Sequence, residues 1–308
     1  MQIEDKKAQE QNQESGKGTL YLVATPIGNM EDITLRALRI LKEVDLIAAE
    51  DTRQTLKLLN HYEIKKPLTS YYEHNKNVKG NYLIKELLNG KNVALVTDAG
   101  SPGISDPGED MVRLAIDNGI NVTMIPGPVA AITGLVISGM PTGRFVFEGF
   151  LPVNKRARKE RILSLKNETR TIIFYEAPHK LIYTLKDLYN YLGERKIALA
   201  RELTKKFEEV VRCTLSEAIE KYETQGFKGE YVLIVEGASE EVSMKEKESQ
   251  MENDWEWNKK SIGEHVEFYI KQGMSKKEAI KKVAQDRNLS RNEVYKEIIE
   301  WKNKGNTE

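Results

Sequence analysis

Short apolar runs alternate along the first part of the chain with segments in which apolar residues recur every three or four positions. Four of these runs have the unbroken apolar character of strands that are buried on both faces. They lie at residues 20–24, 46–49, 93–96 and 122–125. Helical spacing is found between them at residues 34–43, 78–89 and 108–118. The pattern predicts successive β-α-β units and therefore a parallel sheet.

A second set of apolar runs follows a Pro-Gly-Pro segment at residues 126–128. Its strands are predicted at residues 145–147, 171–175, 197–200 and 231–235, with helices between them. Strands that alternate with helices are typical of the α/β class. We therefore predict two α/β domains, one at residues 18–126 and one at residues 127–238.

Two segments contain little that a folded core could bury. Residues 1–17 are rich in Gln, Glu, Lys and Asn, and we predict a disordered tail that takes no part in the fold. Within residues 239–258, seven acidic residues stand against two lysines. This shift in composition predicts an acidic linker.

The last segment, residues 259–308, has the pattern of three short amphipathic helices. Ser275 with Glu278, and Ser290 with Glu293, have the Ser-x-x-Glu spacing of a helix-capping box. The short connection between the second and third helices is similar to that of a helix-turn-helix. Twelve Lys or Arg against eight acidic residues fit contact with nucleic acid or an ordinary solvated bundle that mediates dimerisation.

Composition narrows the class of protein further. The chain has 47 basic and 47 acidic residues, so a basic surface for nucleic acid has to be local. Its single cysteine argues against a disulfide framework and fits a reducing compartment, which predicts a cytoplasmic protein. No apolar run approaches the ~18 residues of a membrane helix, so no membrane partner is expected.

Gly, Pro, Asp, Ser and Asn are concentrated directly after the predicted strands of the first domain. The segments are residues 25–29, 50–53, 97–108 and 126–128. Ligands of parallel α/β sheets bind outside the carboxyl ends of the strands, where these segments are expected to converge. Such residues permit tight turns and close backbone approach, so we predict a binding cleft at this edge.

Several common chemistries are not supported. The sequence has no phosphate-binding loop of the G-x-x-x-x-G-K-[ST] type, no G-x-G-x-x-G after the first strand, no H-E-x-x-H and no G-x-S-x-G. The four histidines show no metal-ligand spacing, and we predict no metal site.

Taken in order, these segments resemble the bacterial 16S rRNA (cytidine 2′-O)-methyltransferase family, which lies within the tetrapyrrole methylase superfamily. The resemblance is carried by residues 25–37, 49–53, 97–108, 147–152 and 201–205. It extends from about residue 18 to residue 237, and the C-terminal helical segment is similar as well. The resemblance implies S-adenosylmethionine in a cleft between two α/β domains, a homodimer, and a 16S rRNA acceptor in the small ribosomal subunit near the decoding centre.

The resemblance also implies which residues bind the cofactor. The residues that the resemblance assigns to the amino-acid end of the cofactor are Gly100, Ser101, Pro102, Ile104 and Ser105. It assigns to the next wall of the cleft Pro128, Val129 and Ala130. It assigns to the adenine pocket Tyr175, Ala177, Leu203, Gly229 and Glu230. Two positions depart from the family pattern, because Ser101 replaces the Asp of Gly-Asp-Pro and Val129 replaces a small hydroxyl residue.

Three carboxylates follow strands at the expected cleft and are candidates for catalysis. Methyl transfer to a ribose hydroxyl needs alignment of donor and acceptor, and a carboxylate within hydrogen-bond reach can accept the hydroxyl proton. The candidates are Glu50, Asp51 and Asp98. The alternative is that they bind loop backbone or pair with Arg53, which in turn either clamps a phosphate or pairs with Asp51.

A local basic segment begins directly after Pro152. Residues 154–170 hold seven Lys or Arg against two Glu. This excess fits phosphate contacts, although such a run is also found on solvated helix faces. The residues predicted to bind the substrate are Asn29, Arg53, Lys155, Arg156 and Arg158.

Two other functions remain open at this point. One is a methyltransferase of the same fold that acts on a tetrapyrrole or on a protein residue, which would not need the basic segment and the helical tail. The other is a non-enzymatic nucleic-acid-binding regulator built on residues 259–308, which would bind the cofactor without turnover.

Overall fold

The structure is a computed structural model that describes residues 16–224, 228–239, 260–287 and 289–305. It divides into two compact units, Met1–Gly237 and Ala238–Glu308, and each is described here by itself. Apart from Gly16, Lys17 and Ser239, the predicted tail and the predicted acidic linker lie outside the described residues. Lys17 donates from Nζ to the main-chain oxygen of Asn118 at 3.0 Å, so the described fold begins with this residue.

The first sheet is parallel throughout and has the strand order β3-β2-β4-β1-β5. Its strands are β1 (Thr19–Val23), β2 (Leu46–Ala49), β3 (Leu68–Ser70), β4 (Val93–Val96) and β5 (Asn121–Ile125). The predicted parallel sheet is confirmed. The short edge strand β3 was missed because its three residues carry no apolar run.

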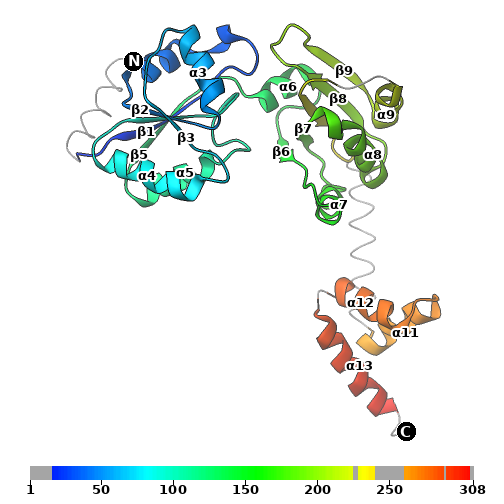
Figure 1. The fold of residues 1–308 in the computed structure, drawn as a ribbon. Coiled ribbons are helices and arrows are strands. Elements are labelled where there is room, and N and C mark those ends of the chain that lie inside the picture. Colours follow the sequence, from blue (N-terminus) through cyan, green and yellow to red (C-terminus); the bar gives the residue numbers. More distant parts are fainter. Residues whose placement is uncertain (1–15, 225–227, 240–259, 288, 306–308) are drawn as a thin grey trace. The chain divides into compact units, whose positions relative to one another are not determined.

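Helices cover both faces of this sheet (Figure 1). They are η1 (Met30–Asp32), α2 (Leu35–Glu43), α3 (Thr52–His61), α4 (Lys76–Leu88) and α5 (Gly108–Asp117). Side chains alternate along each strand, so one set packs with α2 and α3 around Leu41, and the other packs with α4 and α5 around Leu83. Helix α2 begins where the sequence predicts, since Thr34 Oγ1 accepts from Ala37 N at 3.1 Å.

The second sheet is mixed and has the order β6-β7-β10-β8-β9. Its strands are β6 (Phe145–Phe150), β7 (Thr171–Glu176), β8 (Lys196–Arg201), β9 (Glu209–Thr214) and β10 (Tyr231–Val235). Strand β10 lies between β7 and β8 and is antiparallel to both. Strand β9, which the apolar pattern did not reveal, forms an antiparallel pair with β8 at the edge.

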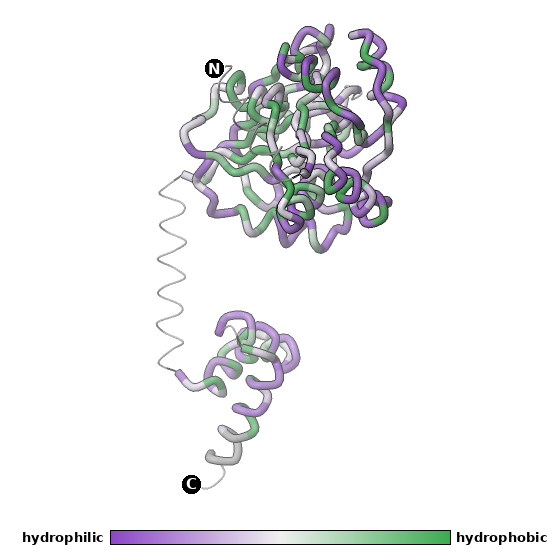
Figure 2. The backbone as a smooth tube through the Cα atoms, turned by 90° about the vertical axis from the view of Figure 1, so that its left-hand side faces the viewer, coloured by the Kyte–Doolittle hydropathy of each residue, from purple (hydrophilic) through white to green (hydrophobic). Residues whose placement is uncertain are grey.

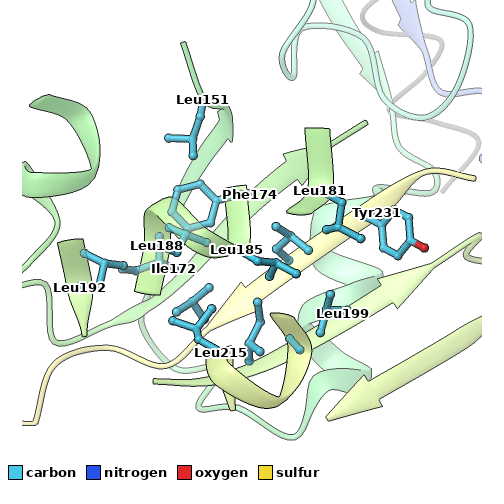
Figure 3. Close-up of a cluster of buried hydrophobic side chains, with 14 of the residues drawn as sticks. Leu151, Ile172, Phe174, Leu181, Leu185, Leu188, Leu192, Leu199, Leu215 and Tyr231 are labelled. Carbon is cyan, nitrogen blue, oxygen red and sulfur yellow. The ribbon is translucent and has the colours of Figure 1, made fainter. Parts of the chain in front are cut away.

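Helices also cover both faces of the second sheet. They are α6 (Ala130–Ser138), α7 (Lys155–Ser164), η2 (Pro178–Lys180), α8 (Leu181–Leu192) and α9 (Leu215–Thr224). The face under α7, α8 and α9 forms a large core around Phe174 and Leu185 (Figure 3). Helix α6 packs on the other face, where Gly134 lets it approach Val232 closely. The α/β class that the sequence predicts is confirmed for both sheets.

The second unit consists of α11 (Ile262–Lys271), α12 (Lys276–Asp286) and α13 (Arg291–Gly305). Both predicted capping boxes are present, and Ser261 with Glu264 makes another. The three predicted helices are confirmed, and they pack around Val266, Val283 and Ile298.

Hydrophobic segments of the α/β unit run through its interior and hydrophilic segments lie outside them, as Figure 2 shows. In the part of the chain that the structure describes, no helix has both the length and the apolar character needed to cross a bilayer.

Candidate functional site

The loops after β1 and β4 meet at the carboxyl edge of the first sheet. Thr25 N donates to Gly100 O at 2.9 Å, and Gly100 N donates back to Thr25 O at 3.1 Å. Gly100 has φ +86°, a conformation that residues with a side chain rarely adopt. Ser101 Oγ donates to Pro128 O at 3.3 Å and so joins the loop after β5 to the same place. The predicted convergence of these loops is therefore present.

The loop after β4 is held internally by Asp106. Its carboxylate accepts from Gly103 N at 2.9 Å and from Gly108 N at 2.7 Å. Ser105, beside it, is held at φ +68°, an uncommon conformation for a residue with a side chain. Backbone strain of this kind persists only where the surrounding bonds impose it, and it is frequent at ligand sites.

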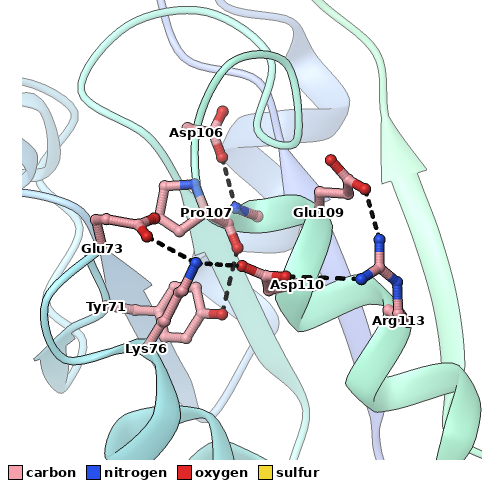
Figure 4. Close-up of polar contacts among 9 residues, drawn as sticks. Tyr71, Glu73, Lys76, Asp106, Pro107, Glu109, Asp110 and Arg113 are labelled. Atoms are coloured by element: carbon pink, nitrogen blue, oxygen red, sulfur yellow. Dashed lines mark hydrogen bonds and ion pairs between the residues drawn. The ribbon is translucent and has the colours of Figure 1, made fainter. Parts of the chain in front are cut away.

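The far end of the same loop is fixed to the neighbouring helix (Figure 4). Lys76 Nζ lies 2.7 Å from both Glu73 Oε1 and Asp110 Oδ2, and these bonds raise the pKa of Lys76. Tyr71 donates from its hydroxyl to Pro107 O at 3.2 Å, and burial raises the pKa of Tyr71 to about 12. The loop is thus anchored at both ends before any ligand binds.

A cavity of about 540 Å³ opens beside this loop, within the size range of small-molecule sites. Residues that follow strands of the first sheet form one wall, which is polar. They include Glu50, Thr97, Asp98, Ser101, Ser105 and Asp106. Residues of the second sheet and its loops form the other wall. Its apolar part, called the apolar wall below, consists of Tyr175, Ala177, Ala200, Leu203 and Val232, and the charged Glu176, Glu202, Lys205 and Glu230 line the same side.

Two of the predicted carboxylates lie together on the polar wall. Thr97 Oγ1 donates to Glu50 Oε2 at 2.6 Å, and Asp51 N donates to Asp98 Oδ1 at 2.9 Å. Burial raises the pKa of Asp98, and the carboxylates of Glu50 and Asp51 raise it further against the lowering effect of that N–H bond. Asp98 is therefore a more basic carboxylate than an ordinary Asp, and it lines the cavity.

Asp51 has a different position and is not among the residues that line the cavity. Its carboxylate caps α3 by accepting from Arg53 N at 2.8 Å, and it accepts from Arg53 Nη2 at 2.7 Å. These bonds hold the pKa of Asp51 at about 2. A carboxylate so weakly basic and so fully bonded is a poor proton acceptor, so the alternative interpretation of Asp51, that it pairs with Arg53, is the one the structure supports.

Tyr175 connects the apolar wall to helix α6. Its hydroxyl oxygen accepts from Ala131 N at 3.2 Å, at the start of that helix. The ring of Phe147 lies 5.0 Å from the Tyr175 ring in an edge-on arrangement, and the ring of Phe150 lies 5.5 Å from it at a tilt. Burial raises the pKa of Tyr175, which stays a neutral hydroxyl at physiological pH.

Three charged side chains, of which the resemblance marked Glu230, form a group at the rim of the apolar wall. Lys205 Nζ is 3.0 Å from Glu202 Oε1 and 2.9 Å from Glu230 Oε2. Burial alone would lower the pKa of Lys205, but the bonds to the two carboxylates outweigh it and raise that pKa. Gly28 approaches this group so closely that a Cβ there would lie 2.5 Å from Lys205 Cγ. The loop after β1 therefore packs directly against the rim of the second sheet.

Most of the residues assigned to the cofactor by resemblance do line the cavity. Pro102, Pro128 and Gly229 do not, although each adjoins a residue that does. The lining also includes Glu176, which lies between Tyr175 and Ala177 in the stretch that the resemblance assigns to the adenine pocket. Within the described residues, no group of three or more His, Cys, Asp or Glu is placed to hold a metal ion.

The residues predicted to bind the substrate lie outside the cavity, and one of them is corrected. Asn29 caps η1 by accepting from Glu31 N, while the side chains of Lys155 and Arg156 are exposed. The Arg158 side chain is buried, and its Nε lies 2.6 Å from Asp187 Oδ2. A guanidinium in this position cannot reach an RNA phosphate, so the prediction for Arg158 is wrong.

Comparison with known proteins places this geometry in a family. Residues 19–219 match the tetrapyrrole (corrin/porphyrin) methylases. The chain is 51% identical over 290 residues to ribosomal RNA small subunit methyltransferase I of Halalkalibacterium halodurans, covering 94% of this chain and 98% of that one. It is 50% identical to the protein of the same name in Bacillus subtilis, covering 92% and 95%. The chain belongs to the ribosomal RNA small subunit methyltransferase I family of tetrapyrrole methylases.

Solved structures show the same fold at low sequence identity. The methyltransferase CobJ superposes with a TM-score of 0.56 at 17% identity, covering 72% of this chain and 95% of that one. A uroporphyrin-III C-methyl transferase from Thermus thermophilus, complexed with S-adenyl homocysteine, gives 0.51 at 18% identity over 70% and 97%. The predicted tetrapyrrole methylase fold is therefore confirmed.

Proposed function

We propose that this protein transfers a methyl group from S-adenosylmethionine to the ribose 2′-hydroxyl of a cytidine in 16S rRNA, at position 1402. The observation that carries the proposal is a cleft lined both by Asp98, a carboxylate of raised pKa, and by the apolar side chains of Tyr175, Leu203 and Val232. The names of the relatives at about half identity supply the class of acceptor.

The residues of the cleft fit the proposed cofactor. S-adenosylmethionine combines a cationic sulfonium, a charged amino-acid end and a flat adenine ring. Glu50 on the polar wall suits the cation, while Tyr175 and Leu203 on the other wall suit the ring. Gly149 packs closely against the loop that carries Ser105, because a Cβ at Gly149 would lie 2.8 Å from Ser105 Oγ. When bound, the cofactor supplies an activated methyl group.

In this proposal the protein mainly aligns its two substrates. Alignment alone can supply ~7–11 kcal/mol of the activation barrier. Asp98 accepts the proton of the ribose hydroxyl, for which its raised pKa suits it better than that of Asp51. Glu50 accepts a hydrogen bond from the hydroxyl of Thr97 and so holds the start of the loop after β4 in place.

For the RNA we propose contacts outside the cavity, on the exposed part of α7. Lys155 and Arg156 are exposed at its first turn, and Phe150, just before the helix, lines the cavity. Arg53, which is also exposed, keeps guanidinium surface available beside Asp51. Cations at the mouth of a cleft position a phosphate backbone without specifying sequence.

Two further expectations belong to this proposal. The homodimer that the resemblance implies is tested by the sedimentation mass of the full chain. A cytoplasmic location follows from the proposed rRNA substrate.

The experiment that tests the function locates the transferred methyl. The protein is incubated with tritiated S-adenosylmethionine and, in separate reactions, 30S subunits, naked 16S rRNA or total protein. We expect label in rRNA, on the ribose of one cytidine after nuclease digestion and mass spectrometry. Label in protein or in a tetrapyrrole, with none in RNA, would show that the acceptor is different. Asp98→Asn serves as the low-activity control.

A further inference from the structure

The segment between β8 and β9, residues 202–208, is a loop with an unusual backbone. In the described part of the chain, four residues other than glycine have a positive φ, and two of them are Glu202 at +51° and Thr204 at +66°. Such conformations persist only where the surrounding bonds impose them. Thr204 N donates to Glu208 Oε2 at 2.6 Å, and Lys205 N donates to Glu202 O at 3.0 Å. These bonds close the loop on itself and fix its shape.

The 202–208 loop lies at the edge of the second sheet where the cavity is found. Strands β6, β7 and β8 all end at this edge, because β6 and β7 are parallel and β10 is antiparallel to both β7 and β8. Glu202, Leu203 and Lys205 line the cavity. The loop after β1 supports this loop from the other side, since a Cβ at Gly28 would lie 2.8 Å from Leu203 O. The 202–208 loop is therefore braced at the cavity by both sheets.

The two residues after Lys205 are a cation and an aromatic ring that the fold leaves exposed. Phe207 has 67% of its surface exposed, and Lys206 Nζ lies 5.8 Å from the centre of its ring. Lys205 is paired with two carboxylates, whereas Lys206 forms no ion pair with any described residue. Exposed apolar side chains are common on protein surfaces. An aromatic ring beside an unpaired cation, on a loop of fixed shape next to a cavity, is the arrangement that binds a nucleic-acid base and its phosphate.

A second exposed aromatic ring lies at the same edge of the sheet. Phe150, the last residue of β6, is 57% exposed and lines the cavity. Strands β7 and β10 separate β6 from β8, so three strand spacings of ~4.8 Å put the ends of β6 and β8 about 14 Å apart. The ends of β7 and β10 between them supply Tyr175 and Val232 to the cavity. An RNA strand that passes from the start of α7 across the cavity therefore arrives at the 202–208 loop.

We propose that Phe207 stacks on a base of the RNA next to the acceptor cytidine, and that Lys206 contacts the phosphate beside that base. The inference rests on the proposed function and names a surface that holds the proposed substrate. A cavity of about 540 Å³ that also holds a cofactor admits a single nucleotide and not a stacked strand. The acceptor nucleotide is then separated from its neighbour, and the Phe207 ring replaces the stacking partner that this neighbour loses.

The test compares two lysine–aromatic pairs of the same unit. Phe207→Ala removes the ring, and Phe207→Trp keeps an aromatic surface. Tyr82→Ala is the matched control, because Lys79 Nζ lies 5.4 Å from the centre of the exposed Tyr82 ring on α4 and neither residue lines the cavity. The kcat and the KM for the RNA that the wild type methylates are measured on the full chain, together with Tm, S-adenosylhomocysteine affinity and sedimentation mass.

We expect Phe207→Ala to raise the KM for RNA by about tenfold, while Phe207→Trp and Tyr82→Ala stay within about twofold of the wild type. Lys206→Gln should raise this KM by several-fold and flatten its salt dependence. Cofactor affinity, Tm and sedimentation mass should not change in any of these variants. Equal effects of Phe207→Ala and Tyr82→Ala on the KM would overturn the inference. A smaller sedimentation mass of Phe207→Ala would overturn it too, because the ring would then lie between copies of the chain.

An abasic nucleotide in the RNA tests whether the ring meets a base. It is placed in turn on the 5′ and the 3′ side of the acceptor cytidine, in the RNA that the wild type methylates. We expect one of the two positions to raise the KM of the wild type by about tenfold and to leave the KM of Phe207→Ala unchanged. Effects that add to that of Phe207→Ala at both positions would contradict the proposal. If the wild type methylates no RNA, the proposed function fails. If it methylates RNA and Phe207→Ala has the KM of the wild type, only the present inference fails.

Discussion

The two walls of the cleft are built by different kinds of sheet. The polar wall follows strands that are all parallel, so all of them end at the same edge, and the segments after β1, β2, β4 and β5 contribute residues to the cavity. The apolar wall belongs to a mixed sheet, in which the ends of β7 and β8 lie beside the start of β10. Tyr231 pairs with both Glu176 and Arg201 at that edge.

Because of this difference, we expect the two walls to serve different steps of the reaction. Loops rich in Gly, Pro and Asp give the polar wall fixed hydrogen-bonding groups, such as Asp106 on its own loop backbone. Strands β7, β8 and β10 supply Tyr175, Ala200 and Val232 to the apolar wall. We therefore expect loss of Asp98 on the polar wall to change the rate, and loss of the Tyr175 ring on the apolar wall to change the affinity for the cofactor.

The largest effect is expected from Asp98→Asn on the polar wall. Loss of a proton acceptor should lower kcat by about 100-fold, within the usual range for general-base catalysis. Because Asp98 is placed beside the acceptor and not the adenosine part, binding of S-adenosylhomocysteine should stay within about threefold. Single-turnover methylation and calorimetry measure the two quantities. A lost affinity with an unchanged kcat would reverse the assignment of the walls.

The pH dependence of kcat tests the same residue. A base works only when deprotonated, so the rate should fall as the pH drops through the raised pKa of Asp98. The acid limb should therefore lie above the pH expected from an ordinary Asp, and it should be absent from the residual activity of Asp98→Asn. An identical acid limb in that variant would assign it to another group.

On the apolar wall, Tyr175→Ala should weaken binding of S-adenosylhomocysteine by about tenfold, since stacking on an aromatic ring contributes ~1–3 kcal/mol per base. Tyr175→Phe keeps the ring and loses only the bond to Ala131 N, so its affinity should stay within about twofold. Calorimetry compares the two. If Tyr175→Phe and Tyr175→Ala weaken binding equally, the hydroxyl of Tyr175 and not its ring is the group that determines cofactor affinity.

Charge reversal outside both walls should have a smaller effect, confined to RNA. The double variant Lys155→Glu with Arg156→Glu should raise the KM for RNA by several-fold and flatten its salt dependence, with no change in cofactor affinity. The control is Lys65→Glu with Lys66→Glu, two lysines that come just before the edge strand β3 of the first sheet and do not line the cavity. Equal effects of both pairs would indicate only a general response to charge.

The smallest effect is expected from Asp51→Ala. It removes the cap of α3 and the ion pair with Arg53, so Tm should fall slightly while kcat stays within about twofold. The pKa of Asp51 is lowered to about 2 from its ordinary 3.8. The stabilisation that the ionised Asp51 carboxylate gives to the fold is therefore complete above pH 3.8 and lost as the pH falls through about 2. In thermal melts, the difference in Tm between the wild type and Asp51→Ala should therefore become smaller as the pH is lowered over that interval.

The same difference between the walls explains how far the sequence could predict the site. For the first sheet, unbroken apolar runs indicated parallel strands, and position after a strand was enough to find Glu50 and Asp98. For the second sheet, Tyr175, Leu203 and Glu230 were reached only through the resemblance, because strand direction decides which residues meet and no periodicity reveals direction. Arg158 was misplaced because a helical run of basic residues does not show which of them points inward.

The central claim is that the two walls divide the cofactor between them, and a crystal structure of the full chain with S-adenosylhomocysteine tests it most directly. We predict the adenine ring against Tyr175, Leu203 and Val232, and the amino-acid end on the loop around Gly100 and Ser101. A ligand lying wholly on one wall, or outside the cavity, would contradict the account.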